Sequence, residues 1–115
     1  MTKSKQEVTP SYGSIFRAIE ARVKAAKFGP EFLATQITLT GACDFQPLYI
    51  RVEDGLAEIA PYEYHNADFY IDSDADAMAA VLNGKKTIYD AVREGSVTVN
   101  GVADKAIVFI NDFFG

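Results

Sequence analysis

Residues 67–101 read ADFYIDSDADAMAAVLNGKKTIYDAVREGSVTVNG, and this stretch decides the expected fold because its apolar period changes twice. Phe69 and Ile71 flank Tyr70, which is the alternation of a half-buried strand. Two short helical stripes follow, each closed by a glycine: Met78, Val81 and Leu82 before Gly84, then Ile88, Ala91 and Val92 before Gly95. The strand period returns at Val97 and Val99. The stretch therefore predicts a strand, two helices and a second strand, in that order.

The segments on either side complete the expected set of elements. Apolar residues at helical spacing predict a helix over 11–27, which Gly29 and Pro30 end. Alternating residues then predict three strands: 32–40, 48–52 and 56–60. Asp54-Gly55 predicts the hairpin turn between the last two, because both residues tolerate a positive φ. Residues 41–45 are expected to form a turn, and 102–113 a final helix.

Strands that precede helices, with one strand returning late, indicate an α+β fold. We expect an antiparallel or mixed sheet of about five strands, covered by helices on one face, and not a doubly wound parallel sheet. Residues 1–10 lack apolar periodicity and predict a disordered tail, so 11–115 would form the single domain. A chain of 115 residues, nearly half of them hydrophobic, is long enough to bury a core.

Charge and cysteine content exclude several classes of function. A net charge of −5 argues against binding nucleic acid, which requires clustered lysine and arginine. Cys43 is the only cysteine, so no disulfide within the chain is expected. No apolar run approaches the roughly 20 residues that span a bilayer, so stable membrane insertion is not expected, and the N-terminus does not resemble a signal peptide. A cytoplasmic protein is the expectation.

The residue types that carry catalysis or bind metals are sparse, so we expect no enzyme, no cofactor and no metal site. His65, the only histidine, lies in a polar segment with no recognisable partner for acid–base chemistry. Asp72, Asp74 and Asp76 alternate as in a calcium loop, but the glycine and glutamate that such a loop requires are missing. Ser73 and Asp76 instead have the spacing of a capping box, which predicts that the next helix begins just after Ser73.

The final helix carries more apolar surface than a helix that covers one sheet requires. One face contains Ala106, Phe109, Ile110 and Phe113, and further apolar residues extend the surface around the helix: Ile107, Val108 and Phe114. An ordinary surface helix has an apolar stripe little wider than 100°. Other helices, a partner chain or a bound apolar ligand could cover the excess, and the sequence leaves all three open.

From Ala67 onward the sequence resembles the sterol carrier protein type two family. The features that carry the resemblance are the strand 67–71, the aspartate-rich helix start at 73–78, the Gly84-Lys85 helix end, the Glu94-Gly95 helix end and the strand before Gly101. The resemblance implies a five-stranded sheet with helices that enclose an apolar tunnel for lipids. It implies no shared catalytic residues. The family pattern often has a polar residue where this chain has Val102.

These observations give two hypotheses. In the first, the chain binds a fatty acyl, sterol-like or quinone-like ligand between the sheet and the C-terminal helices, as a carrier or accessory factor. The candidate ligand-binding residues are Phe69, Ile71, Met78, Leu82, Ile88, Val92, Val97, Val99, Phe109 and Phe113. The same residues could equally form a filled core. In the second hypothesis, the apolar final helix is a non-catalytic interaction surface, for instance in a homodimer that Phe113 and Phe114 hold together.

Overall fold

The structure of the protein is a computed structural model that describes residues 7–41 and 46–114. Within these ranges the chain forms four helices and one five-stranded sheet. The elements follow one another as α1 (Tyr12–Ala25), β1 (Leu33–Thr40), β2 (Gln46–Glu53), β3 (Leu56–Ala60), β4 (Phe69–Asp74), α2 (Ala75–Leu82), α3 (Ile88–Glu94), β5 (Val97–Gly101) and α4 (Ala103–Phe113). The strand order is β3-β2-β1-β4-β5.

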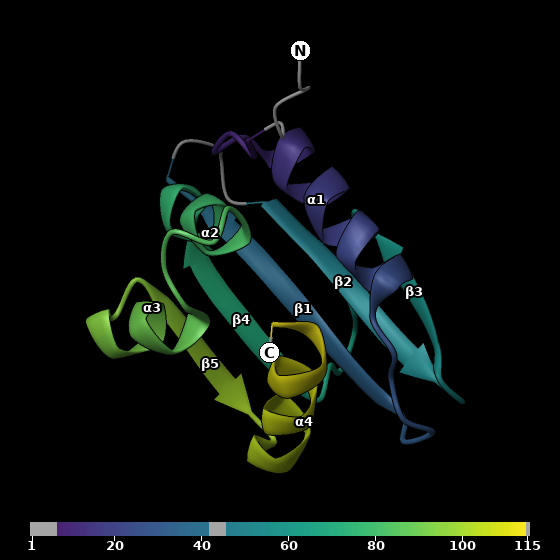
Figure 1. The fold of residues 1–115 in the computed structure, drawn as a ribbon. Helices are drawn as coiled ribbons and strands as arrows, with labels where there is room; N and C mark the ends of the chain where they lie inside the picture. The colour runs from purple at the N-terminus through teal and green to yellow at the C-terminus, as the bar shows by residue number, and fades with distance from the viewer. Residues whose placement is uncertain (1–6, 42–45, 115) are drawn as a thin grey trace.

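The sheet is mixed, because β1 and β4 run parallel and every other neighbouring pair is antiparallel. All four helices lie on one face of this sheet, with α1 over β2 and β3, α3 beside β5, and α4 across the opposite end from α2 (Figure 1). The predicted α+β fold with about five strands is therefore confirmed. The expected turn at 41–45 lies largely outside the described residues.

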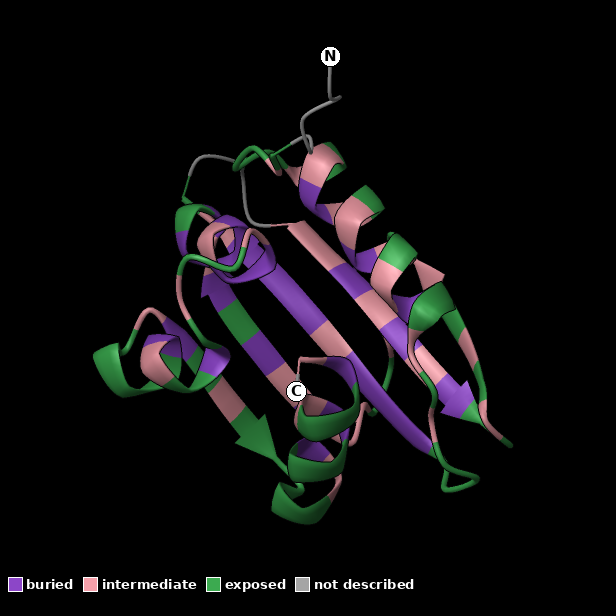
Figure 2. Cartoon of the chain, in the orientation of Figure 1, coloured by how far each residue is buried: buried purple, intermediate pink, exposed green. Residues whose placement is uncertain are grey.

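The core lies between the helices and the sheet. Every second residue of the central strands is buried, and each helix turns its own buried residues toward them (Figure 2). In α1 these residues are Ile15, Ile19 and Val23, which recur at the four-residue spacing seen in the sequence. Burial of this continuous apolar surface is the main stabilising contribution to the fold.

Two local expectations are corrected. Ser73 belongs to β4 and is buried, and its hydroxyl donates to the carbonyl of Asp74 at 2.9 Å, so it does not cap α2. Asp74 occupies the N-cap position without a side-chain cap bond, and the expected capping box does not form. Val92, expected to face inward, is 40% exposed, because α3 lies beside the edge strand β5 and only the stripe with Ile88 and Ala91 is covered.

Asp68 joins three elements just before β4. Its carboxylate accepts a hydrogen bond from the backbone N–H of Ala34 at 2.8 Å, and its own N–H donates to the carbonyl of Ala34. The carbonyl of Asp68 accepts from the N–H of Val102, which directly precedes α4. The start of α4 is thereby fixed against the start of β1 and β4.

The first residues of the described chain also contact the body of the molecule. The backbone of Val8 exchanges two hydrogen bonds with the side-chain amide of Asn83, at 2.8 and 2.9 Å. These bonds attach the segment before α1 to the end of α2.

Candidate ligand-binding site

A cluster of phenylalanine rings fills the interior beneath α4. Phe109 is fully buried at its centre and contacts four other rings at centroid distances of 5.1 to 6.3 Å: Phe28, Phe69, Phe113 and Phe114. Phe69 belongs to the sheet, whereas Phe28 lies between α1 and β1. The inward face of α4 is therefore covered by the chain's own side chains.

Most of the residues expected to line a cavity lie in this interior. The buried ones are Phe69, Ile71, Met78, Leu82, Ile88, Val97, Phe109 and Phe113. Val99 is partly buried against the same core, and Val92 faces solvent. The fold thus brings nearly all of them together, with their side chains packed against one another.

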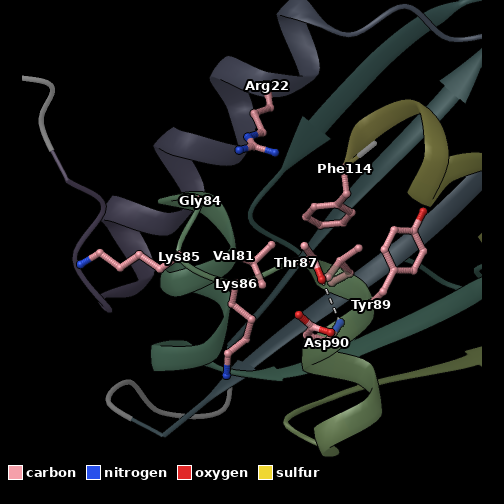
Figure 3. Close-up of a pocket in the computed structure, with 10 residues that line it drawn as sticks. Arg22, Val81, Gly84, Lys85, Lys86, Thr87, Tyr89, Asp90 and Phe114 are labelled. Atoms are coloured by element: carbon pink, nitrogen blue, oxygen red, sulfur yellow. Dashed lines mark hydrogen bonds between the residues drawn. The ribbon is translucent and has the colours of Figure 1, made fainter.

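A pocket of about 390 Å³ opens at the edge of this interior, where the four helices approach one another. Its lining comes from the end of α1, the end of α2, the loop 84–87, the first turn of α3 and the end of α4: Arg22, Val81, Gly84, Lys85, Lys86, Thr87, Ile88, Tyr89, Asp90 and Phe114 (Figure 3). Ile88 is the one candidate residue that also lines this pocket. Phe114 links the pocket to the phenylalanine cluster through its edge contact with Phe109.

The pocket combines apolar and cationic groups. Val81, Ile88 and Phe114 supply apolar surface, and the Arg22 side chain extends from α1 toward them (Figure 3). The guanidinium of Arg22 donates to the carbonyl of Leu82 at 3.3 Å, which is the C-terminal end of α2. Such a pocket suits a molecule with an apolar body and a polar or anionic end.

The two lysines of the pocket already have carboxylate partners. Lys85 lies 2.9 Å from Glu7, and Lys86 lies 2.6 Å from Glu94. These pairs are solvent-exposed and therefore weak. Arg22, by contrast, forms no ion pair with any described residue, so an anionic ligand would not have to displace a carboxylate there. No sequence pattern pointed to Arg22, because access to a pocket depends on the tertiary arrangement.

A second pocket, of about 430 Å³, is lined by Glu7, Val8, Thr9, Ser11, Ser14, Arg17 and Ala18. It lies on the outer side of α1, away from the phenylalanine cluster, and most of its lining residues are polar. It offers little apolar surface for a lipid.

None of the helices in the described ranges lies on the opposite face of the sheet, which presents polar side chains. Tyr49 and Tyr64 contact each other at 5.0 Å, and the Tyr49 hydroxyl donates to the Glu58 carboxylate at 3.0 Å. Burial of the phenol and the neighbouring Glu58 carboxylate raise the pKa of Tyr49 above its usual 10.0. Arg51 pairs with Glu53 and with Glu58, so the charges on this face satisfy one another.

None of the histidines or cysteines in the described ranges lines the pocket. Among the described residues, no three of His, Cys, Asp and Glu lie close enough together to hold a metal ion. His65 lies in an exposed turn before β4 and does not line the pocket. Cys43 lies outside the described residues. None of the four helices in the described ranges has the length and hydrophobicity that crossing a bilayer requires.

The order and pairing of these elements define the fold of sterol carrier protein 2 (SCP2), which confirms the resemblance found in the sequence at the level of the fold. The palmitated SCP2L2 of Aedes aegypti matches with a TM-score of 0.70 at 20% identity, over 84% of this chain and 88% of its own. The apo form of SCP2 from Yarrowia lipolytica matches with a TM-score of 0.66 at 17% identity, over 94% and 99%. No family model and no curated protein sequence matches the chain.

The same fold also occurs inside a much longer chain. The sec-alkyl sulfatase PisA1 of Pseudomonas, solved as a double mutant, matches with a TM-score of 0.65 at 13% identity. The match covers 90% of this chain but 16% of the sulfatase. A unit with this fold can therefore exist either alone or as part of a larger protein.

Proposed function

We propose that this protein is a non-catalytic cytoplasmic binder of a lipid-like molecule, acting as a carrier or accessory factor. The ligand belongs to the fatty acyl, sterol-like or quinone-like class. Its polar end would lie at the pocket near Arg22, and its apolar body would pass Phe114 into the space beneath α4. The SCP2-like fold supports this proposal, and a solved neighbour with that fold is described as palmitated.

The observation that carries the proposal is the position of Phe114. This ring lines the pocket and also contacts Phe109, so a ring–ring contact joins the pocket to the interior. Rotation of a few phenylalanines, or a small outward shift of α4, would let an alkyl chain replace ring–ring contacts with ring–chain contacts. Each Å² of ligand surface buried contributes about 25 cal/mol before the cost of association.

Titration with cis-parinaric acid, a fluorescent fatty acid, tests this proposal. The chain contains no tryptophan, so the fluorescence gained on binding is easily resolved. We expect saturable binding, and we expect Phe114→Glu to weaken it more than tenfold, because a carboxylate would then lie on the path of the alkyl chain. Ile107→Glu is the matched control, since Ile107 lies on the same helix, is 56% exposed and does not line the pocket.

Retention of parinarate affinity in folded Phe114→Glu, or equal losses in the two variants, would contradict binding at this pocket. Circular dichroism of both variants establishes that they are folded. Arg22→Gln supplies a further comparison, because it should weaken the binding of a carboxylate ligand more than that of the corresponding alcohol.

A second candidate function, self-association through α4, has one observation in its favour. Ile107 and Val108 are 56% and 36% exposed on the outer side of this helix. Phe113, which the sequence suggested as a contact residue, is buried within the chain and does not offer a docking surface. Sedimentation of Ile107→Lys tests this candidate: a dimer should dissociate, and an unchanged sedimentation coefficient would exclude α4 as the interface.

A further inference from the structure

Thr35 presents a polar atom that the fold leaves without a partner. It lies in the middle of β1 and is fully buried, and its hydroxyl is the one buried side-chain polar group in the described ranges that has no hydrogen-bond partner. The other buried polar side chains have partners: Thr38 bonds to Gln36, and Ser73 bonds to the carbonyl of Asp74. An unpartnered buried hydroxyl destabilises a protein, and a valine of nearly the same shape would not.

The hydroxyl belongs to the face of the sheet that the helices cover. Thr35 shares the side-chain parity of its buried neighbours Leu33 and Ile37, and it pairs with Ile50 on β2 and Phe69 on β4. Because residues at every second position of a strand point to the same face, its side chain points into the core beneath the helix layer. The polar atom therefore lies in apolar surroundings at the base of the phenylalanine cluster.

A continuous series of rings connects the pocket to this position. Phe114 lines the pocket, contacts Phe109 at 6.3 Å, and Phe109 contacts Phe69 at 5.6 Å. Phe69 is the direct neighbour of Thr35 across the parallel β1–β4 pair. An alkyl chain that enters from the pocket and displaces the rings of α4 would therefore reach the Thr35 hydroxyl with its leading part.

The side-chain hydrogen bonds of α4 lie at its surface, and its start is held by the bond from the Val102 N–H to the Asp68 carbonyl and by the Lys105–Asp68 ion pair at 3.8 Å. Lys105 donates to the carbonyl of Phe32 at 2.5 Å, and the hydroxyl of Tyr89 on α3 donates to Asn111 at 2.9 Å. The N-cap residue, Val102, forms no side-chain cap bond. Moving the C-terminal end of the helix outward thus breaks only the exposed hydrogen bond between Tyr89 and Asn111 among its side-chain hydrogen bonds.

We propose that the ligand carries a hydrogen-bonding oxygen, a hydroxyl or a carbonyl, in the part of its chain remote from its polar end, and that Thr35 Oγ binds this oxygen. This inference rests on the proposed function and narrows it to oxygenated lipids. Plain saturated chains would bind with lower affinity, because they would leave the Thr35 hydroxyl unpartnered.

The test compares hydroxylated fatty acids with their unmodified parents by displacement of cis-parinaric acid. The probes are 16-hydroxyhexadecanoic acid against hexadecanoic acid, and 10- and 12-hydroxyoctadecanoic acid against octadecanoic acid. We expect at least one hydroxy acid to bind about three- to tenfold more tightly than its parent, which is the contribution of one buried neutral hydrogen bond. Thr35→Val should abolish this preference and change the affinity for the parent acid less than twofold.

Two further variants complete the experiment. Thr35→Ser keeps the hydroxyl and should retain the preference, and Thr98→Val, at an exposed position on the other face of the sheet, should leave it unchanged. In the unliganded protein, Thr35→Val should raise Tm by a few degrees, because it removes an unpartnered buried hydroxyl.

Three outcomes would overturn the inference: no hydroxy acid preferred over its parent, the preference intact in Thr35→Val, or a fall in Tm of several degrees in that variant. Failure of the proposed function is a separate result. In that case cis-parinaric acid would not bind to the protein, and neither the hydroxy acids nor their parents would bind.

Discussion

Gly101 shows how a single residue sets the position of α4. Its φ is +130°, a conformation that L side chains rarely adopt, and a Cβ at this position would lie 2.5 Å from both the Asp68 carbonyl oxygen and the Cα of Phe69. The end of β5 can therefore approach the start of β4 only because residue 101 has no side chain. That close approach places α4 over Phe69 and so shapes the candidate site.

The residue-scale prediction is that Gly101→Ala destabilises the protein by about 3 kcal/mol, through backbone strain and overpacking together. Gly95→Ala is the control, because Gly95 also has a positive φ but nothing lies within 4 Å of its added Cβ. That variant should cost about 1 kcal/mol. Urea denaturation measures both, and equal losses would show that the close approach at Gly101 does not constrain the fold.

The sequence predicted residue environments well wherever local periodicity decides them. Ile15, Ile19 and Val23 are buried as their spacing indicated, and Asp54 and Gly55 have positive φ as expected for the hairpin turn. The predictions for Ser73 and Val92 were wrong, because local spacing does not show that β4 continues through Ser73 or that α3 lies at the edge of the sheet. No sequence pattern pointed to Arg22 or Thr35. The access of Arg22 to the pocket and the missing hydrogen-bond partner of Thr35 both depend on the tertiary arrangement.

At the scale of the element, α4 has two apolar faces with different roles. Ala106, Phe109 and Phe113 are buried against the sheet and neighbouring rings, whereas Ile107 and Val108 face solvent. The sequence indicated the excess apolar surface of this helix but could not assign its two faces. The structure shows that the chain itself covers the inner face.

Phe109→Ala should therefore reduce the free energy of unfolding by about 4 kcal/mol, because it removes a fully buried ring that contacts four others. Ile107→Ala, on the exposed face, should change it by less than about 0.5 kcal/mol. Thermal and urea unfolding of the two variants measure this difference. A small loss for Phe109→Ala would mean that α4 is only loosely attached to the sheet.

At the scale of the whole molecule, the sheet divides two environments. The helix-covered face holds the phenylalanine cluster and the pocket, and the other face holds Tyr49, Arg51 and their carboxylate partners. Element order and the late returning strand were enough to predict this layered α+β arrangement. The location of the pocket could not be predicted, because it depends on how the ends of α1, α2 and α4 meet the start of α3.

The proposed function depends on one property, the binding of a lipid by the intact protein. Native mass spectrometry of the purified chain, mixed with hexadecanoic acid, cholesterol or a short-chain ubiquinone, measures it directly. The Aedes aegypti SCP2L2, whose structure is described as palmitated, serves as the positive control. We expect a one-to-one complex with at least one of these lipids, reduced in Phe114→Glu and retained in Ile107→Glu. The absence of any complex, under conditions where the control protein binds palmitate, would contradict the proposed function.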